Sequence, residues 1–380
     1  MPTVAIAGAG IAGFAAAAAL ARKGFAVRVY ERSEEPREFG AGIYLKENSL
    51  PVFDDFGVGE RIAERGVRIR AARIVDETGT VIVNRSVEQE RLIVALRADV
   101  HNLLREAAVQ AGAELVTGRT VTGADPAGRL LFADGDAVEA DLVIGADGLH
   151  SSVRESLSLT RVKGTLGDGA TRVVIPRTEA DEAYSTEYWS GRHRVGVAPC
   201  SEDLTYVFII GPEDEERVRR LPLDREYWTE QFPHLKHVFD RVSDDMGVHH
   251  AHPYVECTSW TSGRVAIIGD AAHAQPPNFG QGAGVAVAAA WRMAETLADH
   301  SDISVGLLEW ERRTRPGIDM VQRLTTVYDV AGYAWPEELA PVRAGIFHDL
   351  SLHPMISSQW EYWWRGGVEA PRPESAGLSK

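Results

Sequence analysis

The chain has 380 residues, of which 44% are hydrophobic and 25% charged, proportions ordinary for a soluble globular protein with room for two domains. Its formal net charge of -15 argues against nucleic acid and anionic membrane surfaces as partners, because both attract basic patches. Cys200 and Cys257 lie far apart without metal-ligand spacing, and no apolar run is long enough for a membrane helix, so we expect a cytoplasmic protein with two free thiols and no metal.

The chain opens with a βαβ unit built around a glycine turn. Residues 4–10 are apolar and β-prone, residues 11–24 favour a helix, and residues 25–32 favour a second strand. In the turn, Gly-Ala-Gly-Ile-Ala-Gly (residues 8–13), the first glycine permits a tight turn, the second lets backbone approach a pyrophosphate, and the third lets the helix pack closely on the strand. Glu31 ends the second strand, where a carboxylate can bind a ribose diol. The unit predicts an adenine-dinucleotide site and does not decide between NAD and FAD.

Two further strand-to-glycine junctions follow. Residues 141–148 form an apolar strand that ends in Gly-Ala-Asp-Gly, with a helix starting near Ser151. Residues 264–269 form another apolar strand ending at Gly-Asp, and the Gly- and Pro-rich loop 275–284 leads from there into a helix of small residues. Both junctions are typical of nucleotide sites, because bare backbone N–H groups and the positive end of a helix dipole meet there.

A different layer is predicted between these junctions. A hairpin is expected at residues 73–84, and segments between residues 166 and 260 alternate or run apolar like antiparallel strands, with a helix over residues 222–242. This layer carries most of the aromatic side chains and several arginines, so it suits a small aromatic anion. Near the C-terminus, an aromatic cluster is expected to pack against the body or a partner subunit: Trp360, Tyr362, Trp363 and Trp364.

The three junctions, taken in order, resemble the motifs of the FAD-dependent aromatic hydroxylases, the single-component flavin monooxygenases typified by p-hydroxybenzoate hydroxylase. The resemblance runs from residue 4 to about residue 315 and favours FAD over NAD. It implies an α/β fold in which a Rossmann-like FAD-binding domain (residues 1–70, 95–165 and 261–335) carries an inserted, mainly antiparallel β-sheet substrate domain (residues 71–94 and 166–260). Residues 336–380 would form a C-terminal helical segment and tail.

The resemblance also implies an FAD site assembled from all three junctions. The glycine turn would hold the pyrophosphate, Glu31 the adenosine ribose, and the loop before the last helix would lie along the isoalloxazine. Arg97, which the residues alone leave open between a phosphate partner and a surface arginine, falls on a family arginine that reaches FAD. The chain departs from the family at Gly284 and residues 288–290, where many relatives have an asparagine and an acidic pair. The residues assigned to the cofactor are Gly8, Gly10, Ile11, Ala12, Gly13, Glu31, Arg32, Gly40, Gly42, Ile43, Arg97, Asp147, Gly148, Gly269, Asp270, Pro277, Gly280, Gln281, Gly282 and Ala283.

The substrate residues are assigned by a looser resemblance to the pyridine-ring oxygenases of this family, which act on 2-methyl-3-hydroxypyridine-5-carboxylate and on 6-hydroxynicotinate. Arg194 or Arg172 would clamp a carboxylate, unless they are surface arginines in ion pairs. Tyr206 or Tyr44 would hydrogen-bond a ring hydroxyl and help to remove its proton, unless they are ordinary sheet residues. Both tyrosines and Pro277 are the candidate catalytic residues, and His273 is expected to be structural.

The implied activity is monooxygenation. NADH or NADPH would reduce FAD, and a flavin hydroperoxide formed with O2 would hydroxylate a small hydroxylated aromatic or pyridine carboxylate. Ring opening of a 3-hydroxypyridine carboxylate is an alternative, as is a flavin-bound reductase or binding protein without oxygenase activity. No second dinucleotide fold is left over, so the nicotinamide cofactor is expected to bind transiently, and the protein to be a monomer or homodimer.

Overall fold

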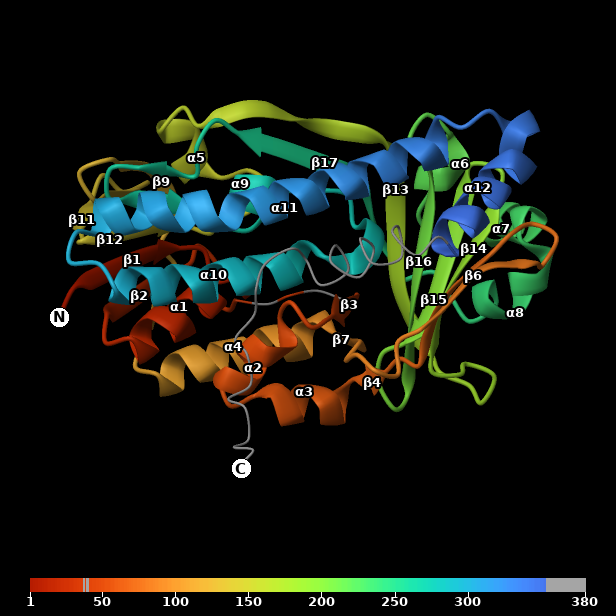
Figure 1. Cartoon of the computed structure of the whole chain (residues 1–380), viewed down its shortest axis with the longest axis horizontal. Coiled ribbons are helices and arrows are strands. Elements are labelled where there is room, and N and C mark those ends of the chain that lie inside the picture. The colour runs from red at the N-terminus through yellow and green to blue at the C-terminus, as the bar shows by residue number, and fades with distance from the viewer. Residues whose placement is uncertain (37, 39–40, 353–380) are drawn as a thin grey trace.

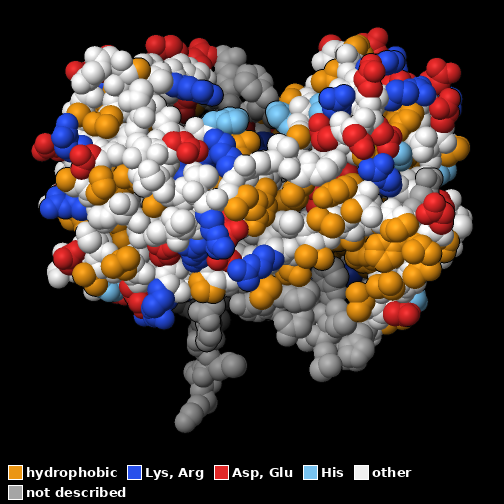
Figure 2. All heavy atoms as spheres, turned by 90° about the horizontal axis from the view of Figure 1, so that it is seen from above, with side chains coloured by type: hydrophobic (Ala, Val, Ile, Leu, Met, Phe, Trp, Pro, Cys, Tyr) orange, Lys and Arg blue, Asp and Glu red, His pale blue; other side chains and the backbone are white. Residues whose placement is uncertain are grey.

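Two sheets of different kinds, each covered by helices, lie side by side in the computed structural model, which describes residues 1–36, 38 and 41–352 (Figure 1). Red and yellow segments from the first part of the chain, together with teal and blue segments from later in the chain, form one half, and the green central segments form most of the other. Among the helices of the described residues, none combines the length and apolar character needed to cross a bilayer. On the face drawn in Figure 2, acidic and basic side chains are interspersed.

A six-stranded sheet forms the centre of the first half. Its strands, in spatial order, are β18 (Thr261–Ser262), β19 (Val265–Ile267), β12 (Leu142–Gly145), β1 (Thr3–Ala7), β2 (Ala26–Tyr30) and β8 (Glu114–Val116). All pairings are parallel except that of the edge strand β18. The carboxyl ends of β1, β12 and β19 therefore meet at one edge, where open parallel sheets bind ligands.

Helices and two small sheets surround this centre. They are α1 (Ile11–Arg22), α2 (Leu50–Asp55), α3 (Gly59–Arg65), α4 (Arg97–Gln110), α5 (Ser152–Ser156), α9 (Asp270–His273), α10 (Gly282–Ala298), β3 (Gly42–Leu45), β4 (Val67–Arg68), β7 (Ile93–Leu96), β9 (Val121–Asp125), β10 (Arg129–Phe132) and β11 (Ala137–Glu139). Ala15–Ala19 of α1 are buried, and α1 packs against both α4 and α10. Small side chains on α1 let all three helices approach closely beside the sheet.

A seven-stranded sheet forms the second half. Its strands, in spatial order, are β17 (Val248–Cys257), β13 (Thr160–Pro176), β16 (Leu204–Pro212), β15 (His193–Pro199), β14 (Tyr184–Ser190), β5 (Ala71–Val75) and β6 (Val81–Ser86). Every pairing is antiparallel except that of β14 with β5. The expected hairpin is confirmed as β5–β6.

The remaining helices complete the structure: α6 (Glu216–Arg219), α7 (Arg225–Gln231), η1 (Pro233–Leu235), α8 (Lys236–Phe239), η2 (Asn278–Gly280), α11 (Ile303–Tyr333), η3 (Glu337–Leu339) and α12 (Ala340–Leu352). The prediction of one helix over residues 222–242 is wrong, because Pro233 cannot continue α7 and a 3-10 turn separates it from α8. α11 runs along both halves (Figure 1) and contacts β13 and η2.

The expected α/β class, with a parallel dinucleotide-type sheet and a mainly antiparallel second sheet, is confirmed. The exact domain boundaries stay a proposal. The aromatic cluster at residues 360–364 and Gly40 lie outside the described residues.

Candidate active site

The glycine turn between β1 and α1 has three different environments at its three glycines. Gly8 has φ +96°, and a Cβ there would lie 2.4 Å from the carbonyl oxygen of Ala146. A Cβ on Gly13 would lie 2.0 Å from the carbonyl oxygen of Gly8. On Gly10, the nearest atom to a Cβ is Glu38 Oε1 at 3.7 Å. The first and third glycines are therefore required by packing, whereas the second leaves space beside the backbone.

The end of β2 is tied to this turn by hydrogen bonds. The Glu31 carboxylate accepts from the backbone N–H of Ala9 (2.9 Å) and of Ser33 (3.0 Å). His101, a buried residue of α4 that the sequence analysis missed, lies with Nε2 2.7 Å from the carbonyl oxygen of Ala9. Glu31 is half-buried, and Arg32 beside it is exposed. Ala9 is therefore held from both sides, which fixes the turn before any ligand binds.

The second and third junctions meet the first. Gly8 abuts Ala146 of the second junction, and a Cβ on Gly269 would lie 2.8 Å from Cβ of Ala12. Asp147 caps α5 through Oδ2, which accepts from the N–H of Ser152 (2.8 Å) and of Val153 (3.2 Å). Its Oδ1 is buried and has no hydrogen-bond partner in the described part of the chain. The three glycine motifs thus form one continuous edge, as their order in the sequence suggests.

Asp270 is the first residue of α9 and follows the glycine of the third junction. It lies deep in the protein, where burial raises the pKa of its carboxyl, yet its side chain is exposed to solvent. Arg97 opposes this pKa shift, which places its guanidinium near the carboxylate. Arg97 also donates from Nε to Glu38 Oε2 at 2.6 Å. A solvent-accessible carboxylate beside an arginine therefore lies at the carboxyl ends of the strands.

The Gly- and Pro-rich loop packs against β3 and leads into α10. Gly280 has φ +57°, its N–H donates to the carbonyl oxygen of Pro277 (2.9 Å), and a Cβ on it would lie 2.7 Å from Cβ of Tyr44. α10 then begins at Gly282 without a side-chain cap or an acidic residue in its first turn, and a Cβ on Gly282 would meet nothing within 4 Å. Gln281 accepts at Oε1 from Nδ2 of Asn48 (2.9 Å), another residue that the sequence analysis missed. The N-terminal turn of α10, which includes Ala283, therefore offers bare N–H groups.

Tyr44, Tyr206 and Arg172 come together from three elements, β3, β16 and β13. The rings of Tyr44 and Tyr206 lie edge to face with centroids 6.3 Å apart. A Cβ on Gly42 would lie 2.4 Å from Cγ of Tyr206, so Gly42 and its buried neighbour Ile43 bring β3 against β16. Arg172 interacts with the Tyr206 hydroxyl. Burial raises the pKa of both tyrosines. Both hydroxyls therefore stay protonated at neutral pH, and their role toward a ring hydroxyl stays a prediction.

The assignment of Arg194 as a carboxylate clamp is corrected by the structure. Arg194 is 1% exposed. Its Nη2 lies 2.7 Å from Asp168 Oδ2 and 3.3 Å from Asp329 Oδ1, and its Nη1 donates to Asn278 Oδ1 at 3.0 Å. Two internal carboxylates thus already occupy the guanidinium, which leaves no paired donors for a substrate.

The two carboxylates that pair with Arg194 also lie close to a histidine, in an arrangement that could hold a metal ion. Asp168, His252 and Asp329 bring potential ligand atoms within 4.8 Å of one another. His252 Nδ1, however, already lies 2.7 Å from Asp329 Oδ1, and the Arg194 guanidinium supplies the positive charge between the carboxylates. The Arg194 guanidinium thus supplies the positive charge that pairs with both carboxylates of the cluster.

His273, in the third junction, is a buried neutral imidazole. Burial lowers its pKa from 6.5 to about 4, and neither ring nitrogen has a hydrogen-bond partner among the described residues. Its ring packs on Trp260 with centroids 5.2 Å apart. These surroundings suit a packing role.

We expect His273→Met to reduce the acid sensitivity of the fold. The pKa of His273 is lower in the folded state than in the unfolded state. The contribution of the neutral imidazole to the unfolding free energy is therefore fully present above pH 6.5 and is lost as the pH falls toward 4. The variant should retain about 3 kcal/mol more of its unfolding free energy across that window, measured by urea unfolding at several pH values. His237→Met serves as the control, because His237 is exposed. If the unfolding free energies of wild type and His273→Met depend on pH in the same way, the prediction is wrong.

FAD fits these residues. Gly10 and Gly282 leave backbone open where a diphosphate and a ring would pass, and the solvent-accessible carboxylate of Asp270 lies near the guanidinium of Arg97. When bound, FAD would be held by the predicted residues of the three junctions, Gly148 (φ +78°) included, and would supply electron transfer and oxygen activation. The fold and the site define a dinucleotide-dependent oxidoreductase of the flavin type.

Comparison with known proteins specifies the family. Residues 1–310 match the model of the FAD binding domain family, so the chain belongs to it. A putative 2-heptyl-3-hydroxy-4(1H)-quinolone synthase, AqdB1 of Rhodococcus erythropolis, is 36% identical over 334 residues, 83% of this chain and 85% of the relative. The 2-heptyl-3-hydroxy-4(1H)-quinolone synthase of Mycobacteroides abscessus is 34% identical, covering 85% of this chain and 88% of its own.

Solved structures agree. Tetrameric 2-methyl-3-hydroxypyridine-5-carboxylic acid oxygenase superposes with a TM-score of 0.82 at 29% identity, over 90% of this chain and 96% of its own. Klebsiella pneumoniae HpxO complexed with FAD and uric acid gives a TM-score of 0.84 over 96% and 97% of the two chains; its 22% identity supports the fold alone. The protein is a FAD-dependent monooxygenase of the aromatic hydroxylase type, as the motifs predicted, and the alternative of a reductase or binding protein is not retained.

Proposed function

We propose that the enzyme hydroxylates a small hydroxylated aromatic or pyridine carboxylate with O2 and NADH or NADPH. The overall reaction inserts one oxygen atom into a ring C–H bond and reduces the other to water, with NAD(P)H as the two-electron donor. Transient binding of the nicotinamide, a monomeric or homodimeric state and a cytoplasmic location belong to the same proposal.

One observation carries the substrate class: Arg172 has no carboxylate partner within salt-bridge distance in the part of the chain that the structure describes. It is half-buried, interacts with the Tyr206 hydroxyl, and has the aromatic pair Tyr44–Tyr206 beside it. An arginine without a carboxylate next to aromatic rings suits a flat anion, which it can bind with two parallel hydrogen bonds. We therefore assign the clamp to Arg172.

The chain's own residues would orient the ring. Tyr206, polarised by Arg172, would donate to a ring oxygen and favour its anionic form, which makes the neighbouring ring carbon more nucleophilic. The Tyr44 hydroxyl is hydrogen-bonded to Ser185 Oγ at 2.8 Å, which fixes its ring as a wall of the pocket. The loop at Pro277–Gly280, which packs on Tyr44, and the N-terminus of α10 would continue this wall and exclude water.

A second candidate substrate is a 2-alkyl-4-quinolone, favoured by the names of the relatives from Rhodococcus and Mycobacteroides. Such a ring has no carboxylate, but its carbonyl oxygen would accept hydrogen bonds from Arg172 or Tyr206. Ring opening of a 3-hydroxypyridine carboxylate is a third candidate, favoured by the pyridine oxygenase among the solved structures.

A substrate panel tests these candidates. Oxidation of NADH and of NADPH is measured with hydroxybenzoates, 3-hydroxypyridine carboxylates, 2-heptyl-4-quinolone and urate, and products are weighed by mass spectrometry. Hydroxylation adds one oxygen atom, whereas ring opening also adds the elements of water. A carboxylate substrate that stimulates oxidation and gains oxygen supports the first candidate; stimulation by the quinolone alone refutes it.

We expect Arg172→Gln to raise the KM for a carboxylate substrate about 10- to 100-fold, because a charge-assisted hydrogen bond contributes about 1.5–3 kcal/mol. FAD affinity should stay unchanged. Arg161→Gln is the matched control, since Arg161 lies on the same strand but is exposed and paired with Glu256 at 3.0 Å. An unchanged KM in Arg172→Gln would refute the clamp.

A further inference from the structure

Phe279 has a backbone conformation that residues other than glycine rarely adopt. Its φ is 62° and its ψ is 0°, and the N–H of Gly280 donates to the carbonyl oxygen of Pro277 at 2.9 Å. This is a turn whose third residue requires positive φ and therefore favours glycine or asparagine. A phenylalanine there is strained, so the surrounding contacts must hold it in place.

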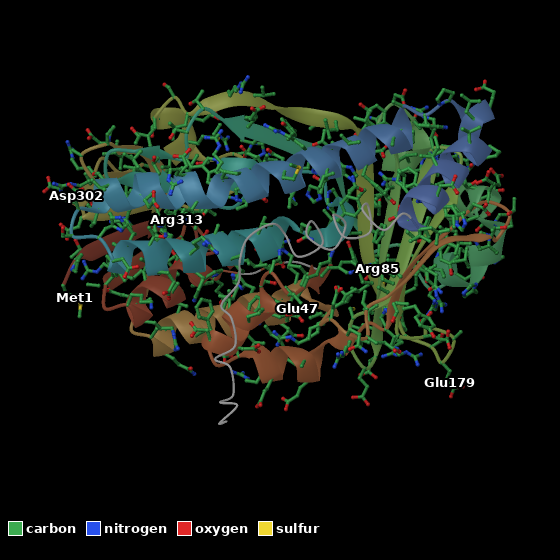
Figure 3. The ribbon with its side chains drawn as sticks, in the orientation of Figure 1. Met1, Glu47, Arg85, Glu179, Asp302 and Arg313 are labelled. Carbon is green, nitrogen blue, oxygen red and sulfur yellow. The ribbon has the colours of Figure 1, made fainter. Side chains whose placement is uncertain are left out.

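A buried lysine forms a hydrogen bond with the backbone of this turn. Lys46 directly follows β3, is 1% exposed, and donates a hydrogen bond from Nζ to the carbonyl oxygen of Phe279. Arg85 and Glu90 are its charged neighbours, and Figure 3 shows Arg85 near the junction of the two halves of the molecule. Burial lowers the pKa of Lys46 well below its ordinary value. Burying an amine is unfavourable, so its presence here needs a reason beyond stability.

The rest of the turn is held through its side chains. Asn278 donates from Nδ2 to the carbonyl oxygen of Thr325 (3.0 Å) and to Asp329 Oδ1 (2.8 Å). The Phe279 ring packs on Tyr328 with centroids 4.8 Å apart. These contacts fix side chains, whereas the Lys46 hydrogen bond acts on the peptide group that follows Phe279.

We propose that Lys46 is a positioning residue for the monooxygenase reaction: it holds the Phe279 carbonyl so that the Pro277–Gly280 turn keeps the form that lies along the flavin ring. The inference rests on the proposed placement of Pro277 and Gly280 beside the isoalloxazine. Without Lys46, the Phe279–Gly280 peptide is no longer held, Phe279 leaves its strained backbone conformation, and the wall of the site moves. Lys46 acts through the backbone of the turn.

Lys46→Met tests the inference, because methionine keeps the length of the side chain and removes the amine. We expect the Tm of the apoprotein to be unchanged or higher, kcat to fall about 10- to 100-fold, and the visible circular dichroism of bound FAD to change. The exposed Lys236→Met is the control. Lys46→Gln, which keeps a donor, should recover at least about a third of the wild-type kcat. Wild-type kcat and flavin spectrum in Lys46→Met, or a lower Tm or misfolding as the main effect, would overturn the inference.

A second variant tests whether the Lys46 amine acts through the backbone of the turn. In Phe279→Gly the strained conformation costs little, so adding Lys46→Met should change kcat by less than about threefold relative to Phe279→Gly alone. If adding Lys46→Met to Phe279→Gly still lowers kcat as much as it does in the wild-type background, Lys46 does not act through the turn. A wild-type protein that binds no FAD would instead refute the proposed function, so the two failures are distinguishable.

Discussion

Replacing Gly10 by valine is expected to abolish FAD binding and leave the fold intact. Gly10 precedes α1 with φ −80° and ψ −173°, a backbone conformation that valine adopts without strain. A Cβ there meets only the flexible end of Glu38, at 3.7 Å. The added methyl groups would occupy the space through which the diphosphate approaches the backbone N–H groups. Losing two charge-assisted hydrogen bonds of about 1.5–3 kcal/mol each lowers FAD affinity at least about 100-fold.

Titration of the apoprotein with FAD, followed by quenching of flavin fluorescence, measures this loss. The unfolding transition of Gly10→Val should match that of wild type. Gly164→Val is the control, since Gly164 lies in β13, where a Cβ would meet nothing within 4 Å, and is remote in sequence from the three junctions. FAD binding by Gly10→Val within about threefold of wild type would show that the diphosphate lies elsewhere.

Arg194→Gln is expected to destabilise the protein by about 3–5 kcal/mol, because it leaves the buried carboxylates of Asp168 and Asp329 without their cation. Burial already raises the pKa of Asp168, and Arg194 opposes that rise. Without Arg194 the folded pKa rises further, so protonation relieves the loss, and the destabilisation should be smaller at pH 5 than at pH 8.

Urea unfolding at the two pH values measures the effect, with Arg161→Gln as a surface control that should change stability by less than about 1 kcal/mol. If Arg194 were instead a substrate clamp, its variant would unfold like wild type and show only a raised KM. That outcome would contradict the structural role described above.

The glycine junctions could be predicted from the sequence because each depends on local backbone requirements. Gly8 and Gly13 are needed wherever a strand turns tightly into a helix, whatever the remainder of the chain does. The meeting of β1, β12 and β19 at one edge then follows from parallel pairing. FAD as the cofactor could be predicted from the order of the motifs, and the family match over residues 1–310 confirms it.

Residues whose role depends on distant partners could not be predicted. Arg194 lies among apolar residues of a strand, a pattern that also fits an arginine lining a substrate pocket. The partners that decide its role come from the distant elements β13, η2 and α11. Lys46 follows a short strand among polar residues, so nothing local marks it as buried. His101, in contrast, lies on the apolar face of α4, so the helical pattern of the sequence could have predicted that it is buried and makes an internal contact.

The central claim, that this chain inserts oxygen into an aromatic ring, is tested most directly with isotopically labelled dioxygen. The holoenzyme is supplied with NAD(P)H, 18O2 and the panel compound that most stimulates cofactor oxidation, and the product is weighed. We predict a ring product carrying one 18O atom for each NAD(P)H consumed in coupled turnover. Oxidation of NAD(P)H that delivers all of the label to hydrogen peroxide, with no labelled product from any compound, would contradict the account.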